Sequence, residues 1–476
     1  MNNQTTQPVS QLPGYITSAV PNPRSNRAPW YKNTAPTYAG IFLWFVFWDP
    51  VTSGGQGLAA GLPVALVGLV LAALACHFLF YLVPGLLGMK TGLPLYIVGT
   101  STFGARGGFL MPGFLMGVLQ FGWVGVNSFF SAMLIYNAFA STPIDPGSHY
   151  PVSGHAIIAI VFAALAAFMG LKGIKYVARV ATYLPLLPLA ILLILLVKTM
   201  GGIADFKPEQ IIASQKITAP LGGLGVIALM LTYVVGFFAT AGAAGVDFGL
   251  NSQDKNDVSK GGLIGIALAI VVTAGISLMV VAGAYGGAKL DAIPTAANAT
   301  GLMGAIMGKQ TANIFMLLLA IAAFPPGCFS SFIAANSFKT TLPKVNPFIS
   351  VGIGTVVSII LAVTGWAGQV VPVFVIIGAS FGPICGAMLV NYLLNGKKWS
   401  GPRAGFNPAG WIAWAAGFVV GILPNLHSWK PDAFPSVPAA PVLAFVVGAV
   451  VYFLCAKIGM LSPVVPVTGA LAEATK

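Results

Sequence analysis

The sequence predicts a polytopic α-helical membrane protein. Of its 476 residues, 57% are hydrophobic and only 7% are charged, against roughly 25% charged residues in a typical soluble domain. Apolar stretches close to the roughly 20 residues that a helix needs to cross the hydrocarbon core recur along the chain. The alternating pattern of membrane β-strands does not occur, and helices satisfy their own backbone hydrogen bonds in lipid. The fold class is therefore all-α.

Hydropathy indicates about twelve spanning helices. They are expected at residues 37–61, 63–84, 109–136, 154–171, 179–200, 222–246, 261–284, 312–335, 346–364, 370–394, 409–424 and 439–456. The polar amino-terminal stretch leads into many further spans, which is not the pattern of a cleaved signal peptide. We expect residues 1–36 and 458–476 to be cytosolic tails.

The basic residues predict the orientation, because cytoplasmic loops retain Lys and Arg. With both termini inside, 17 of the 23 Lys and Arg residues lie on the inner side. We therefore expect an integral protein of a bacterial inner membrane or a plasma membrane, with cytoplasmic termini. The net charge of +13 then reflects topology and attraction to anionic lipids. The sequence has no basic helix with interleaved aromatic residues, so we expect no nucleic-acid binding.

Cysteine and histidine residues give no sign of a metal site or of an enzyme. The four cysteines fall in apolar spans without metal-ligand spacing, and the four histidines are scattered singly. Small buried residues are the usual role of such cysteines. Neither a zinc site nor a nucleophile and base pair is indicated, so we expect no cofactor and no enzymatic activity.

Two spans contain helix-breaking residues and are expected to be interrupted. The first span has Trp48-Asp49-Pro50 followed by the glycine-rich run 53–57, and the sixth has Gly242-Ala243-Ala244-Gly245. Interrupted helices five spans apart are typical of transporters with inverted repeats, in which unwound backbone faces a solute at mid-membrane. The alternative is that these small residues only permit close helix packing.

We therefore predict a five-plus-five inverted repeat with two further helices. Residues 37–200 form the first repeat, residues 222–395 the second, and residues 409–457 the last two helices. In the second repeat, Pro325-Pro326-Gly327 predicts a break in the eighth span and supplies candidate gating residues.

Only two of the ten acidic residues, Asp49 and Asp247, fall within predicted spans. A carboxylate at membrane depth costs about 2.5 to 3.5 kcal/mol, so it usually faces a cavity. Asp49 could bind a cation, accept a solute N–H or carry a proton; alternatively it caps a half-helix. Gln56, in the same unwound stretch, is a further candidate solute contact. Asp247 is expected at the cytoplasmic end of the sixth span, near basic residues of the next loop, with a gating or structural role.

A polar face runs along the third span. Gln120, Trp123, Asn127 and Ser131 follow at intervals of three, four and four residues, so they share one side of a helix. A mid-span Trp beside an amide offers a stacking surface with a donor and an acceptor, which suits a planar heterocycle. The alternative is a polar stripe that joins two helices. Phe237-Phe238, before the break in the sixth span, could supply a second ring opposite Trp123.

Several short motifs resemble those of the nucleobase:cation symporter family, the purine and cytosine permease and hydantoin transporter group. The resemblance covers most of the chain. It rests on Gly122-Trp123-Val124-Gly125-Val126-Asn127, Gly236-Phe237-Phe238-Ala239-Thr240, Asp247-Phe248, Thr91-Gly92-Leu93-Pro94, Gly382-Pro383-Ile384-Cys385-Gly386, Asn391-Tyr392 and Phe406-Asn407-Pro408.

This resemblance implies the leucine-transporter fold, with a base sandwiched between Trp123 and Phe238 and contacted by the amide of Asn127. It implies import of a nucleobase-like solute by alternating access, coupled to H+ or Na+. Sodium-coupled members place hydroxyl groups on the eighth span, where this chain has Ala322-Ala323. Ser330 or backbone carbonyls could substitute, but a proton carried by Asp49 is the favoured hypothesis.

Three alternatives remain open at this point. The same fold could carry an amino acid, a vitamin or an osmolyte; the chain could be an uncoupled channel or facilitator; or it could be an intramembrane enzyme. The expected partners are a small-molecule solute and the lipid bilayer, in a monomer or weak homo-oligomer.

Overall fold

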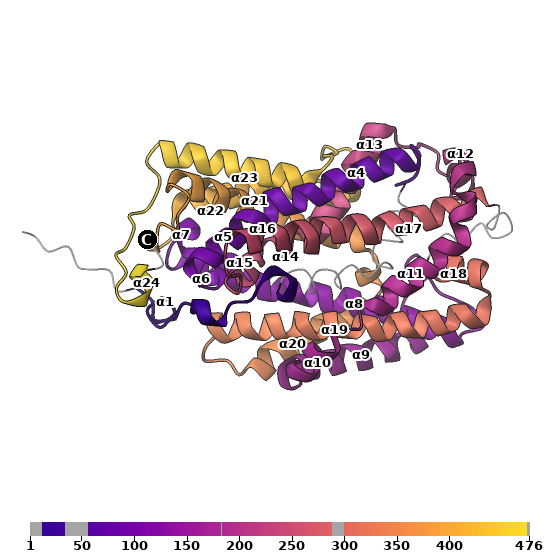
Figure 1. The fold of residues 1–476 in the computed structure, drawn as a ribbon, viewed down its shortest axis with the longest axis horizontal. Coiled ribbons are helices and arrows are strands. Elements are labelled where there is room, and N and C mark those ends of the chain that lie inside the picture. The colour runs from indigo at the N-terminus through magenta and orange to yellow at the C-terminus, as the bar shows by residue number, and fades with distance from the viewer. Residues whose placement is uncertain (1–11, 34–55, 182, 288–298, 474–476) are drawn as a thin grey trace, which may run out of the picture.

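The computed structural model describes residues 12–33, 56–181, 183–287 and 299–473. Within these ranges no β-strand forms, and only two isolated bridges, Ala28 to Ser252 and Arg403 to Val464, join extended segments. The long helices run roughly along one axis, horizontal in Figure 1. The all-α prediction is confirmed.

Ten helical stretches in the described ranges are long and apolar enough to cross a membrane. Five are uninterrupted: α9 (Ser153–Lys172), α19 (Lys309–Thr341), α21 (Val370–Leu394), α22 (Pro408–Trp429) and α23 (Ala440–Lys457). Five contain a π or 3-10 segment: α4 (Leu62–Ala75) with Cys76–Tyr81 and α5 (Leu82–Thr91), Phe109–Phe114 with α8 (Leu115–Phe139), α11 (Leu186–Thr199) with Met200–Asp205, α13 (Gly223–Met230) with Leu231–Val235 and α14 (Gly236–Ala243), and α16 (Lys255–Gly262) with Leu263–Leu268 and α17 (Ala269–Gly286).

The predicted ninth span is α20 (Pro347–Val363), a shorter apolar helix of 17 residues. The predicted first span lies outside the described residues except for its end. The number of twelve spans therefore stays a prediction. Shorter helices complete the described chain: α1 (Gly14–Thr17), α6 (Leu95–Val98), α7 (Thr100–Phe103), α10 (Ile174–Ala181), α12 (Pro208–Ser214), α15 (Gly245–Gly249), α18 (Ala299–Met307) and α24 (Ala470–Glu473).

Two predictions about helix bounds were wrong. The fifth span begins at Leu186 rather than at 179, because 174–181 form the separate helix α10 and Pro185 precedes α11. The eighth span does not break at Pro325-Pro326-Gly327, since α19 is continuous from Lys309 to Thr341 with both prolines inside it. Membrane helices tolerate proline where neighbouring groups replace the lost hydrogen bonds.

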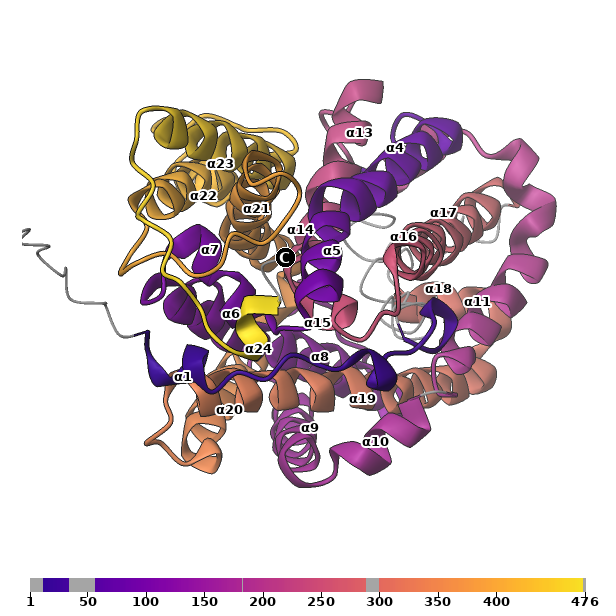
Figure 2. The same cartoon turned by 60° about the vertical axis from the view of Figure 1, so that its left-hand side comes forward.

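The helices pack in groups that meet near α14. In one group α8 lies against α9, α19 and α20; in another α21, α22 and α23 pack together; and α4 contacts α13 and α17. Figure 2 shows α14 between these groups. Because α14 also packs against α21, side chains from the third, sixth and tenth predicted spans converge there.

The sixth span is interrupted at Ala244, within the predicted Gly242–Gly245 stretch. The short helix α15 follows and packs tightly on α5. A Cβ atom on Gly249 would overlap the carbonyl oxygen of Gly85, and one on Gly88 would overlap that of Val246. Glycine at these positions lets the two backbones touch, which fixes α15 beside the loop that follows α5.

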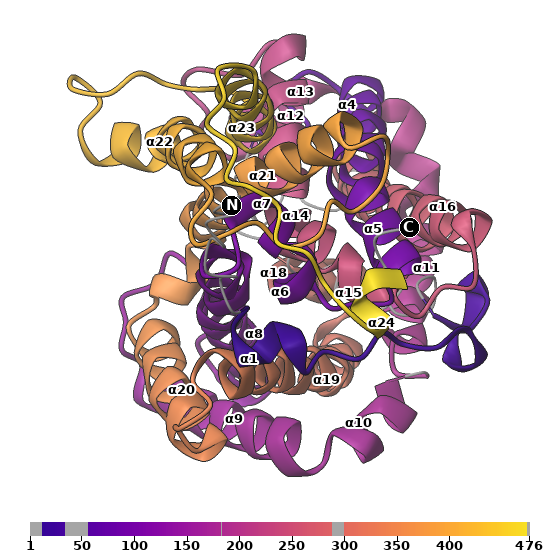
Figure 3. The same ribbon diagram turned by 90° about the vertical axis from the view of Figure 1, so that its left-hand side faces the viewer.

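The end of the bundle that carries α5, α6, α15 and α16 is covered by irregular chain (Figure 3). Residues 12–33 cross it: Arg27 donates to the Met89 and Asn22 carbonyls, and the side-chain amide of Asn22 to the Leu250 carbonyl. Buried Arg403 donates to the carbonyl oxygens of Ser101 (3.0 Å) and Ser462 (2.8 Å). Hydrogen bonds from side chains thus replace helical ones where the backbone is irregular.

Candidate functional site

Three aromatic rings from three helices form the centre of the candidate site. Trp123 of α8 lies 4.8 Å from Phe237 of α14 at an interplanar angle of 80°, and 5.7 Å from Phe374 of α21 at 34°, measured between ring centroids. Phe237 and Phe374 are 5.3 Å apart at 86°. Edge-to-face contacts at these separations are the favourable geometry for aromatic rings.

A small residue allows α14 to approach α21. A Cβ atom on Gly236 would lie 2.7 Å from the carbonyl oxygen of Phe374, closer than a side chain permits. Gly236 directly precedes Phe237, so this close backbone contact helps to set the position of the Phe237 ring against Phe374. At Gly122 a Cβ atom would lie 3.9 Å from Val373 Cγ1, an ordinary van der Waals contact.

The resemblance assigned the second ring to Phe238, but the ring in contact with Trp123 belongs to Phe237. Phe238 is fully buried, with 0% of its surface exposed. Consecutive residues of an α-helix point about 100° apart, so the two rings cannot both face α8. Both remain candidates, with Phe237 in the position expected for a solute contact.

The polar face of α8 stays buried beside the rings. The side-chain amide of Asn127 donates to the Trp123 carbonyl oxygen over 2.9 Å, and Asn127 lies next to Gly327 of α19. Gln120 Nε2 is 3.5 Å from Met116 Sδ, a weak contact. Ser131 Oγ is buried, and no described residue provides it with a partner. The stripe therefore does not form a continuous polar bond between helices, and Asn127 has its Oδ1 available as an acceptor.

The two prolines of α19 change its backbone chemistry without breaking the helix. A proline at position i removes the N–H that would bond the carbonyl of residue i−4. Pro325 and Pro326 thus leave the carbonyl oxygens of Ile321 and Ala322 without their helical donors. Ala322 is buried, so its free acceptor lies inside the protein.

The remaining candidates are placed differently. Asp49 lies outside the described residues. Gln56 Oε1 accepts the backbone N–H of Leu221 over 2.8 Å, which joins the end of the first span to the residues preceding α13. Ser330 is buried in α19 with 8% of its surface exposed, and the part of the first span that would face it is not described.

Asp247 pairs with backbone instead of with the lysines that follow it. Its Oδ1 accepts the N–H of Leu95, the first residue of α6, over 3.0 Å. It lies beyond the spanning part of the sixth helix, in α15. Burial raises the pKa of the Asp247 carboxyl to about 6, although the hydrogen bond from Leu95 opposes this rise. The carboxylate thus links the sixth span to the loop between the second and third.

Sequence reasoning did not find Phe374. A single Phe in an apolar span carries no signal of its own, and only the packing of α21 on α14 brings it to Trp123. The contacts of residues 12–33 were also missed, because a polar tail shows no pattern that identifies its partners.

A membrane-embedded helical bundle in which rings and an amide converge between helices is compatible with a transporter of small solutes, and the family match identifies the class. The chain belongs to the family of permeases for cytosine and purines, uracil, thiamine and allantoin, whose model matches residues 21–448. The family resemblance is thereby confirmed, and the protein is an integral membrane transporter rather than an enzyme. No curated protein matches the chain.

Solved structures support the same fold. The inward-facing conformation of Mhp1 is 16% identical with a TM-score of 0.62, and the comparison covers 94% of this chain and 95% of that one. Mhp1, described as a nucleobase-cation-symport-1 family transporter, closed with bromovinylhydantoin bound, is 15% identical with a TM-score of 0.60, covering 98% and 99%. A substrate-bound Na+-coupled sialic acid symporter is 13% identical with a TM-score of 0.58, covering 95% and 93%.

The raised pKa of Asp247 predicts a specific pH dependence of stability. Because the folded protein holds this proton more tightly than the unfolded chain, the stabilisation is complete below the ordinary pKa of 3.8 and is lost as pH rises through about 6. Asp247→Asn keeps an acceptor for Leu95 but cannot titrate. We expect the difference in Tm between pH 5 and pH 7, measured on purified protein in detergent, to shrink in this variant.

Asp432→Asn, which removes an exposed carboxylate, is the matched control and should keep the pH dependence of the unaltered protein. The same pH dependence in Asp247→Asn as in the control would contradict the assignment.

Proposed function

We propose that the protein imports a nucleobase or a related planar heterocycle by cation-coupled symport with alternating access. The observation that carries this proposal is the convergence of Trp123, Phe237 and Phe374 beside Asn127. The family description, which includes cytosine, purines and uracil, supports the same solute class. So does the bromovinylhydantoin bound to Mhp1.

The ring geometry indicates how a flat solute would be held. Two rings that sandwich a planar solute lie about 7 Å apart, twice an ordinary van der Waals contact. The present centroid distances of 4.8 and 5.7 Å around Trp123 are shorter. Binding therefore requires the ring of Phe237 or Phe374 to rotate away from Trp123, so that solute entry is coupled to a change in α14 or α21.

The amide of Asn127 supplies the polar contact. One N–H of its Nδ2 is bonded to the Trp123 carbonyl, so the Oδ1 and the second N–H of Nδ2 are left for the solute. An acceptor beside a stacking ring favours a heterocycle with an N–H group at its edge, as in cytosine, uracil or a purine. Gln120, two turns away on the same helix, is a second candidate amide.

We favour a proton as the coupling ion, carried by Asp49 in the first span. Sodium is the alternative, since hard cations prefer oxygen ligands and the hydroxyl of Ser330 in α19 is such a group. One hydroxyl does not make a sodium site, and the other ligands would have to come from other parts of the chain. For proton coupling a single titratable carboxyl is sufficient, and Asp49 supplies one.

The arrangement in the membrane follows the same proposal. Residues 37–200 and 222–395 act as inverted repeats, with both termini in the cytoplasm, and Asp247 contributes to the cytoplasmic gate through its bond to Leu95. Pro325, Pro326 and Gly327 let α19 flex beside Asn127.

Uptake into proteoliposomes tests the proposed solute class. Radiolabelled cytosine, adenine, uracil and hydantoin are offered under imposed proton or sodium gradients. Loss of one stacking surface costs about 1 to 3 kcal/mol, so Trp123→Ala should weaken the affinity for the transported base by roughly 5- to 150-fold. Trp429→Ala, at a site with 69% of its surface exposed, should leave uptake unchanged. Absence of uptake of every base would refute the solute class and favour another cargo on this fold.

The coupling ion is tested separately with Asp49→Asn. This side chain cannot take up a proton, so we expect accumulation driven by a proton gradient to be lost while exchange of labelled for unlabelled base continues. Ser330→Ala should have no effect on proton-driven uptake. Full pH-dependent accumulation by Asp49→Asn would exclude the proton role, and a sodium-driven uptake abolished by Ser330→Ala would establish the alternative.

A further inference from the structure

A surface hollow lies where α10 meets the start of α11, away from the solute site. Arg179, Tyr183, Leu184 and Leu187 line it, and its volume is about 410 Å³. The lining is almost wholly apolar, and exposed Arg179 brings a positive charge to its edge. The hollow therefore offers an apolar surface next to a positive charge that can bond a phosphate in bidentate fashion.

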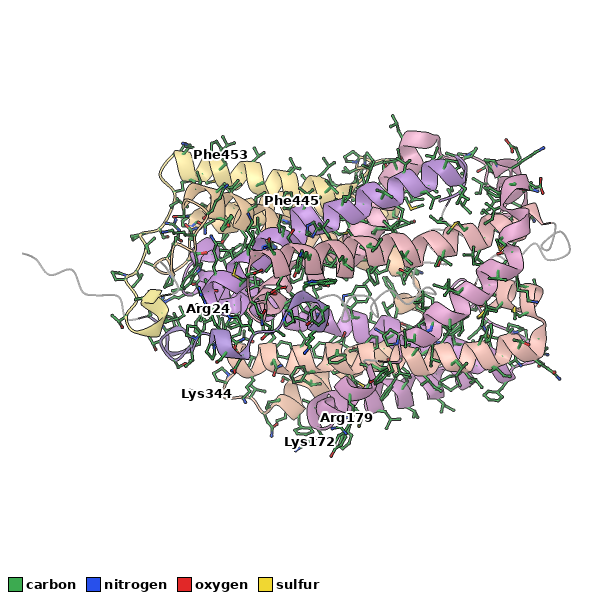
Figure 4. The ribbon with its side chains drawn as sticks, in the orientation of Figure 1. Arg24, Lys172, Arg179, Lys344, Phe445 and Phe453 are labelled. Carbon is green, nitrogen blue, oxygen red and sulfur yellow. The ribbon has the colours of Figure 1, made fainter. Side chains whose placement is uncertain are left out.

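Further basic groups lie at the same end of the bundle as the hollow. Figure 4 labels Lys344, Lys172 and Arg179 along the lower edge of the bundle, and Arg24 above them. The Lys172 ammonium is 5.1 Å from the centroid of the Phe348 ring, which brings the end of α9 to the start of α20. Lys344 precedes that ring by four residues, so these charges come from two connections between spans, α9 to α11 and α19 to α20.

These charges have no acidic partners. The sequence holds no Asp or Glu between Asp145 and Asp205 or between Asp291 and Asp432, so α9, α10, α11, α19 and α20 carry no carboxylate. Within the described ranges, Lys172, Arg179 and Lys344 form no ion pair. No described carboxylate therefore neutralises these three charges.

The side chains around the hollow suit the boundary between lipid and water. Tyr176, Tyr183 and Leu186 have 71%, 70% and 59% of their surfaces exposed. Tyrosine is enriched at membrane interfaces because its ring is apolar and its hydroxyl is polar. A soluble anion would satisfy Arg179 but would leave this apolar surface uncovered.

We propose that the hollow binds an anionic phospholipid, with the phosphate on Arg179, an acyl chain against Leu184 and Leu187, and Lys172 adding to the attraction. On the proposed orientation this end faces the cytoplasm, where the leaflet is negatively charged and basic pockets between membrane helices bind acidic headgroups. The site is independent of the solute and of the coupling ion.

Native mass spectrometry of the full-length protein in detergent, titrated with phosphatidylglycerol or phosphatidylcholine, tests the site. For the double substitution Lys172→Gln with Arg179→Gln we expect binding of the first phosphatidylglycerol to weaken by about thirtyfold, as two surface charges are removed. Phosphatidylcholine binding should not change. A Tm within a few degrees of the unaltered protein shows that the variant is folded.

Lys457→Gln is the matched control. Lys457 also ends a spanning helix, α23, and its ammonium also lies over a ring, 5.4 Å from the centroid of Phe453; Figure 4 shows Phe453 on the opposite side of the bundle from Lys172. This variant should bind phosphatidylglycerol normally. Equal weakening in Lys457→Gln, equal affinity for the two lipids, or displacement of the lipid by inorganic phosphate at matched concentration would each overturn the proposal.

Discussion

Inside a bilayer every backbone N–H and C=O group must find a partner within the protein, and the structure follows from that constraint. This constraint makes the spans helical and restricts non-helical backbone to places where other groups supply its hydrogen bonds. The break at Ala244 is followed at once by α15, whose Asp247 bonds the first N–H of α6. The irregular loop after α5 is likewise held by Arg403. Unwound backbone occurs where side chains replace the helical bonds.

The candidate site depends on the same packing. Helices α14 and α21 meet closely because Gly236 removes side-chain bulk at their contact, and Trp123 of α8 packs against a ring from each. That approach brings three rings to within 6 Å of one another while Asn127 stays beside them on α8. A flat solute can then be recognised by stacking and one amide, without any charged group among the described residues at the rings.

The sequence alone predicted the properties that depend on its composition and on the periodic spacing of its residues. Low charge and repeated apolar stretches predicted the all-α membrane class, and the three-four-four spacing from Gln120 to Ser131 predicted one buried face of α8. It was insufficient where packing decides. Nothing in Phe237-Phe238 indicates which ring faces Trp123, Phe374 carries no local signal, and the prolines of α19 read as a break although neighbouring helices hold that helix continuous.

The central claim is that stacking on the Trp123 cluster recognises the solute, and the adjacent phenylalanines test it most directly. Phe237→Leu and Phe238→Leu remove one ring each while keeping a large apolar side chain, so their effects on packing are similar. The affinity for labelled base, measured by scintillation proximity on the purified protein, should fall severalfold for Phe237→Leu and remain unchanged for Phe238→Leu. Equal affinities in the two variants, or a loss confined to Phe238→Leu, would contradict the account.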